Sequence, residues 1–313
     1  MPSSRPPAAL LLKFVAVVAA VWSIGMFVHT QFPYVRNGAD VVAEAKWRWI
    51  GEDDLFRSDA TTRIVVSGNS KVLAGFRPDL FADAADPTVD AINLGFPGDI
   101  EFLSKIRRLV TSGNAPTHVV LTQRWTSDET PPTWRDRVND DKTIMAAVLP
   151  WRQLPRDLTL FAFRSLKGRN PVERYRGNEA SVRRMIDDRG YYFIEAQSRF
   201  DGDRLPDDFA IATDQPDAPN RKPQSPRSWV VAELESMRRT AGFDVIVLPN
   251  YYRVGQWARA DDPDRDDLPE GWTRRGPAYL LYPPECFSDP VHLNREGAAC
   301  YTADLAGLMK DAL

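Results

Sequence analysis

RIVVSGNS, at residues 63–70, is a short apolar run that ends in a polar, glycine-containing turn. The residues that follow it, 71–76, have the apolar spacing of a helix. A strand, a tight turn and a helix in this order form the unit of an open α/β sheet, in which sites lie at the carboxyl ends of strands. Ser70 is therefore expected beside a helix N-terminus, whose backbone N–H groups favour an anion. Serine is also a common N-cap, and the two roles are compatible.

The same pattern recurs along the chain. A second strand is expected at 90–94, followed by the turn Gly95-Phe96-Pro97-Gly98 and a helix at 99–110. Alternating strands and helices predict an α/β fold with a mostly parallel sheet that is covered on both faces. Further strands are expected at 118–121, 243–248 and 278–281, and further helices at 39–50, 229–240 and 295–313.

The alternation breaks between about 125 and 225, where prolines, arginines and aspartates dominate. We expect an irregular insertion there, with a few short helices such as 179–187. Such an insertion is suited to build a lid or one wall of a substrate site.

The N-terminal region contains an apolar segment long enough to cross a membrane. Residues 14–28 carry no charge, and the run reaches about twenty residues if 8–12 are counted around Lys13. Positive charge on its N-terminal side predicts that the N-terminus stays in the cytoplasm and the rest is exported. No small-x-small site follows, which favours an uncleaved anchor over a signal peptide. We expect a cytoplasmic stub and transmembrane anchor at 1–33 and one extracytoplasmic domain, periplasmic or extracellular, at 34–313.

Charge and composition exclude several kinds of partner. The net charge of −3 gives no strong field for nucleic acid. An acidic loop at 261–267 lacks the glycine and glutamate spacing of an EF-hand. We therefore expect no nucleic-acid partner, no metal and no cofactor.

The chain has two cysteines, Cys286 and Cys300. In an oxidising compartment, a disulfide between them would close a loop of about fifteen residues and contribute roughly 3 kcal/mol to stability. We predict this disulfide. The alternative is two unpaired, buried thiols.

One histidine of the three has an acid beside it: His292 follows Asp289 by three residues in a short turn. The carboxylate can accept a hydrogen bond from one imidazole nitrogen and leave the other to act as a base. The alternative is an Asp-Pro turn that caps the last helix, with His292 on the surface. If the turn reaches the first strand, Ser70 is the nucleophile, His292 the base and Asp289 the residue that fixes the imidazole tautomer. The backbone N–H groups of Ser70 and Gly98 would then bind the oxyanion.

At these residues the sequence resembles the SGNH (GDSL-like) hydrolase superfamily. The segment 65–70 resembles its first block, with the nucleophile at Ser70, and 93–98 resembles its second, with the oxyanion glycine at Gly98. The segment 289–293 is similar to its last block, with Asp289 and His292 in the order D-x-x-H. The resemblance covers about 63–313 apart from the insertion, and it implies a three-layer αβα sandwich.

Two positions depart from the family pattern. Asn69 precedes the nucleophile where the family usually has aspartate. The third block, a Gly-x-Asn-Asp turn that supplies an oxyanion asparagine, is missing after the third strand. Gln123, Arg124 and Asn250 are the candidate replacements.

With its N-terminal anchor, the chain resembles the membrane-tethered members of this superfamily, which act on cell-envelope polymers. The resemblance implies an extracytoplasmic serine O-acyl esterase or transferase, with an acetyl group as the expected acyl group. Its partners would be an acylated polysaccharide or acyl donor and a multispanning membrane acyltransferase. The alternative from another class is a catalytically degenerate SGNH domain that binds glycan or scaffolds an envelope assembly. A third hypothesis is a lipase or thioesterase.

Overall fold

The computed structural model describes residues 8–36, 38–97, 103–122, 148–167, 170–193, 203–206, 228–254, 268–277 and 279–310. The chain forms two compact units. The first consists of 1–41 and 130–180, and the second of 42–129 and 181–313.

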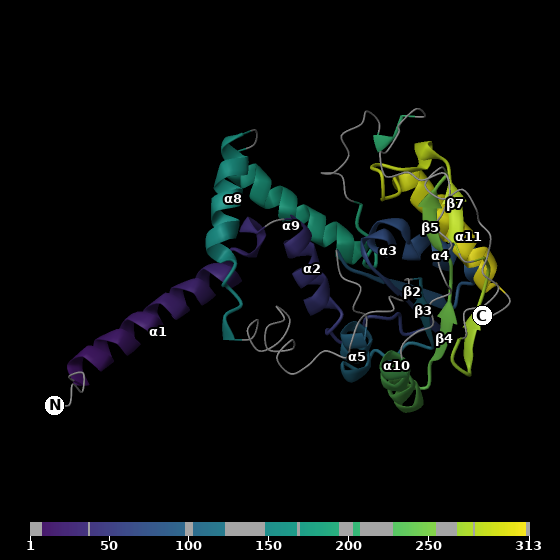
Figure 1. The fold of residues 1–313 in the computed structure, drawn as a ribbon, viewed down its shortest axis with the longest axis horizontal. Coiled ribbons are helices and arrows are strands. Elements are labelled where there is room, and N and C mark those ends of the chain that lie inside the picture. Colours follow the sequence, from purple (N-terminus) through teal and green to yellow (C-terminus); the bar gives the residue numbers. More distant parts are fainter. Residues whose placement is uncertain are drawn as a thin grey trace. The chain divides into compact units, whose positions relative to one another are not determined.

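The second unit is built on a five-stranded parallel sheet with the order β2-β1-β3-β4-β6 (Figure 1). Its central strands are apolar and buried, as expected for a parallel sheet covered on both faces. The predicted α/β class and mostly parallel sheet are confirmed. The strands are β1 (Thr62–Gly68), β2 (Val89–Gly95), β3 (His118–Leu121), β4 (Asp244–Val247) and β6 (Trp272–Arg274).

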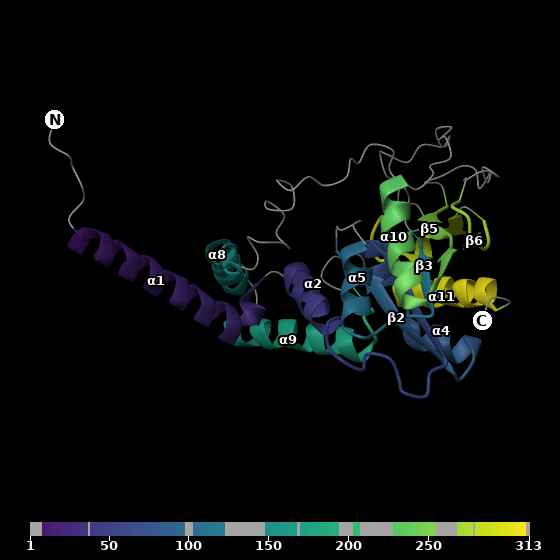
Figure 2. The same cartoon turned by 90° about the horizontal axis from the view of Figure 1, so that it is seen from below.

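Helices cover both faces of this sheet (Figure 2). Successive strand residues point to opposite faces, so Val65 and Val245 lie in one hydrophobic cluster while Val66 and Ile246 lie in the other. Side chains of α5 and α10 complete the first cluster, and those of α3, α4 and α11 complete the second. The helices are α3 (Ser70–Gly75), α4 (Pro78–Ala85), α5 (Leu103–Thr111), α10 (Ser228–Ala241) and α11 (Arg295–Met309).

The strand order reverses beside β1. From β1 the chain moves outward to β2 through α3 and α4, and it returns past β1 to β3 through α5, which lies on the other face. In a doubly wound sheet with this order, the carboxyl ends of the strands at the reversal open a crevice that binds ligands. The carboxyl end of β1, where Ser70 follows, lies at this position.

A second sheet pairs β5 (Asn250–Arg253) in parallel with β7 (Tyr279–Tyr282). The strand at β7 was predicted, whereas β5 and β6 were not. Segment β6 is only three residues long and β5 is rich in polar atoms, so neither has the apolar run that marks a buried strand.

The first unit contains α1 (Ala8–Gln31), η1 (Pro33–Val35) and α8 (Leu154–Leu166). Within α1, Leu10–Gln31 is long and apolar enough to cross a membrane, and only 6% of its most apolar window is buried. The unit boundaries fall within α2 (Gly38–Trp49) and α9 (Pro171–Asp187). In the described parts of the predicted insertion at 125–225, α8 and α9 are helices of 13 and 17 residues, longer than the short helices expected there, and the expected helix 179–187 forms the end of α9. In α9 only Val182 and Met185 are buried, so the sequence carries a weak apolar period there.

Candidate active site

Ser70 is the first residue of α3 and directly follows the turn after β1. The N-cap of α3 is Asn69, whose side-chain oxygen accepts a hydrogen bond from the Lys71 N–H at 2.9 Å. Asparagine and aspartate are equally good in this role, so Asn69 meets the capping requirement of the helix. Capping is thus done by Asn69, and the Ser70 hydroxyl faces another partner.

That partner is His292, whose Nε2 lies 3.0 Å from Ser70 Oγ. The other ring nitrogen, Nδ1, lies 2.8 Å from Asp289 Oδ2. Asp289 Oδ1 accepts hydrogen bonds from the backbone N–H groups of Val291 at 2.7 Å and His292 at 2.8 Å. The structure therefore brings Ser70 to the Asp289–His292 pair, although Ser70 precedes His292 by 222 positions in the sequence.

Burial alone would favour the neutral form of Asp289, but its hydrogen bonds to the His292 ring and to two backbone N–H groups lower its pKa below the ordinary value. An ionised Asp289 accepts a hydrogen bond from the Nδ1–H of His292 and leaves Nε2 as an acceptor for the Ser70 hydroxyl. Because the folded pKa is depressed, the carboxylate stabilises the fold above its unfolded pKa of about 3.9. That contribution is lost as the pH falls through the folded pKa.

The turn that carries His292 is closed at its base. The Ser288 N–H donates to His292 O at 2.9 Å, and Phe287 forms an isolated antiparallel bridge with Leu293. Asn294 then caps α11, accepting from the Gly297 N–H at 2.9 Å and donating to Glu285 O at 2.7 Å. These bonds hold Asp289 and His292 together on one closed loop.

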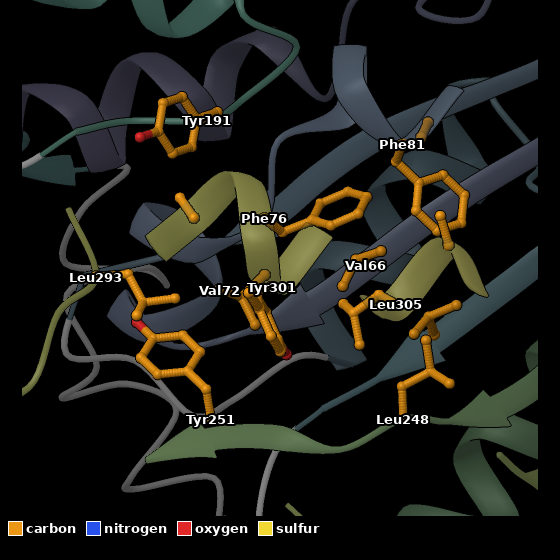
Figure 3. Packing of buried hydrophobic residues seen from close by; sticks show 14 of the residues in the cluster. Val66, Val72, Phe76, Phe81, Tyr191, Leu248, Tyr251, Leu293, Tyr301 and Leu305 are labelled. Atoms are coloured by element: carbon orange, nitrogen blue, oxygen red, sulfur yellow. The ribbon is translucent and has the colours of Figure 1, made fainter. Parts of the chain in front are cut away.

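A buried tyrosine links this loop to the turn that carries Ser70. Tyr251 in β5 is fully buried, and its hydroxyl donates to Lys71 O at 3.1 Å while accepting from the Leu293 N–H. Lys71 Nζ returns a bond to Tyr251 O at 2.8 Å. Burial raises the Tyr251 pKa, so its hydroxyl stays protonated and able to donate. One side chain thus joins the residue after Ser70 to the residue after His292. Figure 3 shows Tyr251 and Leu293 beside each other in the second hydrophobic cluster.

The predicted oxyanion donors are described only in part. Ser70 and Asn250 are described, whereas Gly98, Gln123 and Arg124 lie outside the described residues. Asn250 is half-buried, and its side-chain oxygen accepts from the Tyr251 N–H at 2.8 Å.

The end of β2, before Gly98, is anchored by two buried side chains. Asn93 donates to Val72 O and Phe76 O, each at 2.7 Å, and so holds α3 against β2. Lys46 is fully buried and donates to Gly95 O at 2.7 Å, Gly190 O at 2.7 Å and Asn93 Oδ1 at 3.2 Å. Burial, and then the neighbouring Lys105 ammonium, lower the pKa of Lys46 well below its ordinary value.

Cys286 and Cys300, between which a disulfide was predicted, are both free thiols in this structure. Cys286 packs against the second hydrophobic cluster, and its Cβ faces Gly297, one helical turn before Cys300 on α11. Cys300 itself is exposed. Burial, together with nearby Cys300, raises the pKa of Cys286 to about 11, so its thiol is weakly reactive.

Within the described part of the chain, no three His, Cys, Asp or Glu residues gather as metal ligands. No family model, curated protein or solved structure matches this chain. A functional assignment therefore depends on the chemistry of Ser70, His292 and Asp289.

Proposed function

We propose that this protein is an extracytoplasmic serine O-acyl esterase or O-acyltransferase of the SGNH type. The observation that carries the proposal is the relay from Ser70 Oγ to His292 Nε2 at 3.0 Å and from His292 Nδ1 to Asp289 Oδ2 at 2.8 Å. A nucleophile, a base and a residue that orients the base are the three parts of a serine acyl-transfer site.

Each residue has one task in the reaction. Ser70 Oγ forms a bond to the acyl carbonyl carbon while His292 Nε2 takes the hydroxyl proton, and Asp289 stabilises the imidazolium. The tetrahedral oxyanion is bound by the Ser70 N–H and by Gly98, as the resemblance implies. His292 then gives the proton to the departing alcohol, which leaves an acyl-Ser70 ester. Water or a sugar hydroxyl, deprotonated by His292, attacks this ester, and its proton returns to Ser70.

The substrate class follows from the resemblance and from α1. An enzyme held by Leu10–Gln31 at the outer face of a membrane would act on acyl groups, acetyl first among them, of a cell-envelope or exported polysaccharide. If it transfers rather than hydrolyses, a multispanning acyltransferase is the partner we expect to supply the acyl group. No metal or cofactor takes part in the proposed steps.

Fluorophosphonate labelling of the full chain in detergent tests the proposal. An activated serine forms a bond to phosphorus and expels fluoride, so intact-mass measurement should find one adduct on the wild type. Ser70→Ala and His292→Ala should carry none, and their circular dichroism and melting curves should match the wild type. A folded wild-type protein that takes no adduct would refute catalysis and favour the glycan-binding or scaffold alternative.

Tyr251→Phe should slow labelling about tenfold. The variant keeps the ring in its cluster but leaves Lys71 O and the Leu293 N–H without the hydroxyl that links them, and a small displacement between nucleophile and base is costly in rate. The matched control is Tyr301→Phe, which removes an equally buried hydroxyl that donates to Pro249 O at 2.9 Å. Equal labelling rates in the two variants, at similar melting temperatures, would contradict a positioning role for Tyr251.

A further inference from the structure

Helix α8 of the first unit buries two polar side chains and exposes large apolar ones beside the exposed Arg156, Thr159 and Arg164. It buries Asp157 and Ser165, whose exposed fractions are 1% and 8%, together with Leu154. Its exposed side chains include Leu158, Phe163 and Leu166, with exposed fractions of 40%, 54% and 88%. A helix on a water-facing surface turns its polar side chains outward, so this pattern indicates that the outer face of α8 meets an apolar phase.

The buried polar groups of α8 have partners within the unit. Asp157 lies 3.2 Å from Arg156, which also contacts Asp40 at 3.2 Å. The Ser165 hydroxyl donates to Phe161 O at 2.7 Å. A segment surrounded by lipid needs hydrogen-bond partners within the protein for its polar groups, because acyl chains offer none.

The chain just before α8 lies along the apolar segment of α1. Trp22 Nε1 donates to Val148 O at 2.8 Å. Gly25 is so close to the Trp151 ring that a Cβ there would lie 2.3 Å from it. At a rise of 1.5 Å per residue, Trp22 lies about 14 Å before Gln31, the last residue of α1, and Gly25 lies about 9 Å before it. If α1 spans a bilayer, Val148 and Trp151 therefore lie within its hydrocarbon layer.

We propose that residues 148–166 are a second membrane-binding element, in which the apolar face of α8 inserts among the acyl chains of the leaflet at the Gln31 end of α1. Lys167 follows α8, and its ammonium lies 4.4 Å from the centre of the Phe163 ring. A lysine in this position covers the apolar surface with its stem and keeps its charge among the headgroups. The proposal rests on α1 as a membrane span and not on the chemistry of Ser70.

Site-directed probes on the full chain in vesicles test this element. Phe163→Cys and Leu166→Cys, each in a Cys286→Ser/Cys300→Ser background, are labelled with the environment-sensitive dye NBD and reconstituted into phosphatidylcholine vesicles with and without phosphatidylglycerol. We expect a blue-shifted emission that is lost when doxyl-labelled lipids are added. Glu173→Cys, at an exposed position of α9 in the same unit, is the aqueous control, and Val17→Cys reports on α1.

Each outcome decides the proposal. Quenching at Val17 with aqueous emission at Phe163 and Leu166 would show that α1 inserts and α8 does not, which overturns it. A blue shift without doxyl quenching would assign the covering surface to protein and overturn it as well. Aqueous emission at Val17 would show that α1 does not insert, and it would overturn the proposal, which rests on α1 as a membrane span. Quenching only with phosphatidylglycerol would support insertion that requires anionic headgroups.

Discussion

Asp289→Asn is expected to lower the rate of acyl transfer about 10⁴-fold while the fold persists. Asp289 Oδ1 accepts hydrogen bonds from the backbone N–H groups of Val291 at 2.7 Å and His292 at 2.8 Å. The asparagine oxygen can accept the same two bonds. The asparagine NH₂ then faces His292 Nδ1 and donates to it, so the imidazole proton moves to Nε2. An Nε2–H cannot accept the Ser70 proton, and the general base is lost. The rate of hydrolysis of an activated acetyl ester measures the effect.

Asp86→Asn is the matched control for this substitution. Like Asp289, Asp86 accepts hydrogen bonds from a residue two positions further along the chain. Its Oδ1 accepts from the Thr88 N–H at 2.8 Å and from the Thr88 hydroxyl at 2.7 Å. It lies at the amino end of β2, at the opposite end of the sheet from the candidate site. We expect its hydrolysis rate to match the wild type. A hydrolysis rate for Asp289→Asn within tenfold of wild type would mean that the Asp289–His292 pair does not serve as a relay.

The fold class could be predicted because parallel strands that are buried on both faces have continuous apolar runs in the sequence. β1, β2, β3 and β4 all have such runs, and each was predicted within two residues of its observed ends. The strand order could not be predicted, because it depends on which face each connection covers. The sequence pattern likewise could not predict that 1–41 and 130–180 form one compact unit, because this depends on contacts between distant segments.

The candidate site divides in the same way. Asp289 and His292 were predictable because they are three residues apart and their contact is local. Tyr251 was not, because its bond to Lys71 spans 180 positions and its strand, β5, lacks an apolar run. Sequence spacing also does not record where Cys286 packs: its thiol is free in this structure, and its Cβ faces Gly297.

Lys46→Ala is expected to lower the free energy of unfolding by about 4 kcal/mol. The substitution removes three hydrogen bonds at once, to Gly95 O, Gly190 O and Asn93 Oδ1, and it leaves a cavity where a fully buried side chain lay. The left-handed backbone of Gly190, with φ +95°, brings its carbonyl to Lys46, and no other α2 side chain makes this contact among the described residues. Urea unfolding followed by circular dichroism measures the loss.

Two further variants separate the charge of Lys46 from its volume. Lys46→Met keeps most of the side-chain volume but no donor, so we expect a smaller loss than for alanine. Arg48→Ala, on the exposed side of the same helix, should stay within about 0.5 kcal/mol of wild type.

Because the folded pKa of Lys46 is depressed, the native state binds fewer protons than the unfolded state between that pKa and about 10.4. Over this window the wild type should gain stability relative to Lys46→Met as the pH rises. The opposite slope would mean that the three acceptors outweigh burial and hold Lys46 as an ammonium against the end of β2.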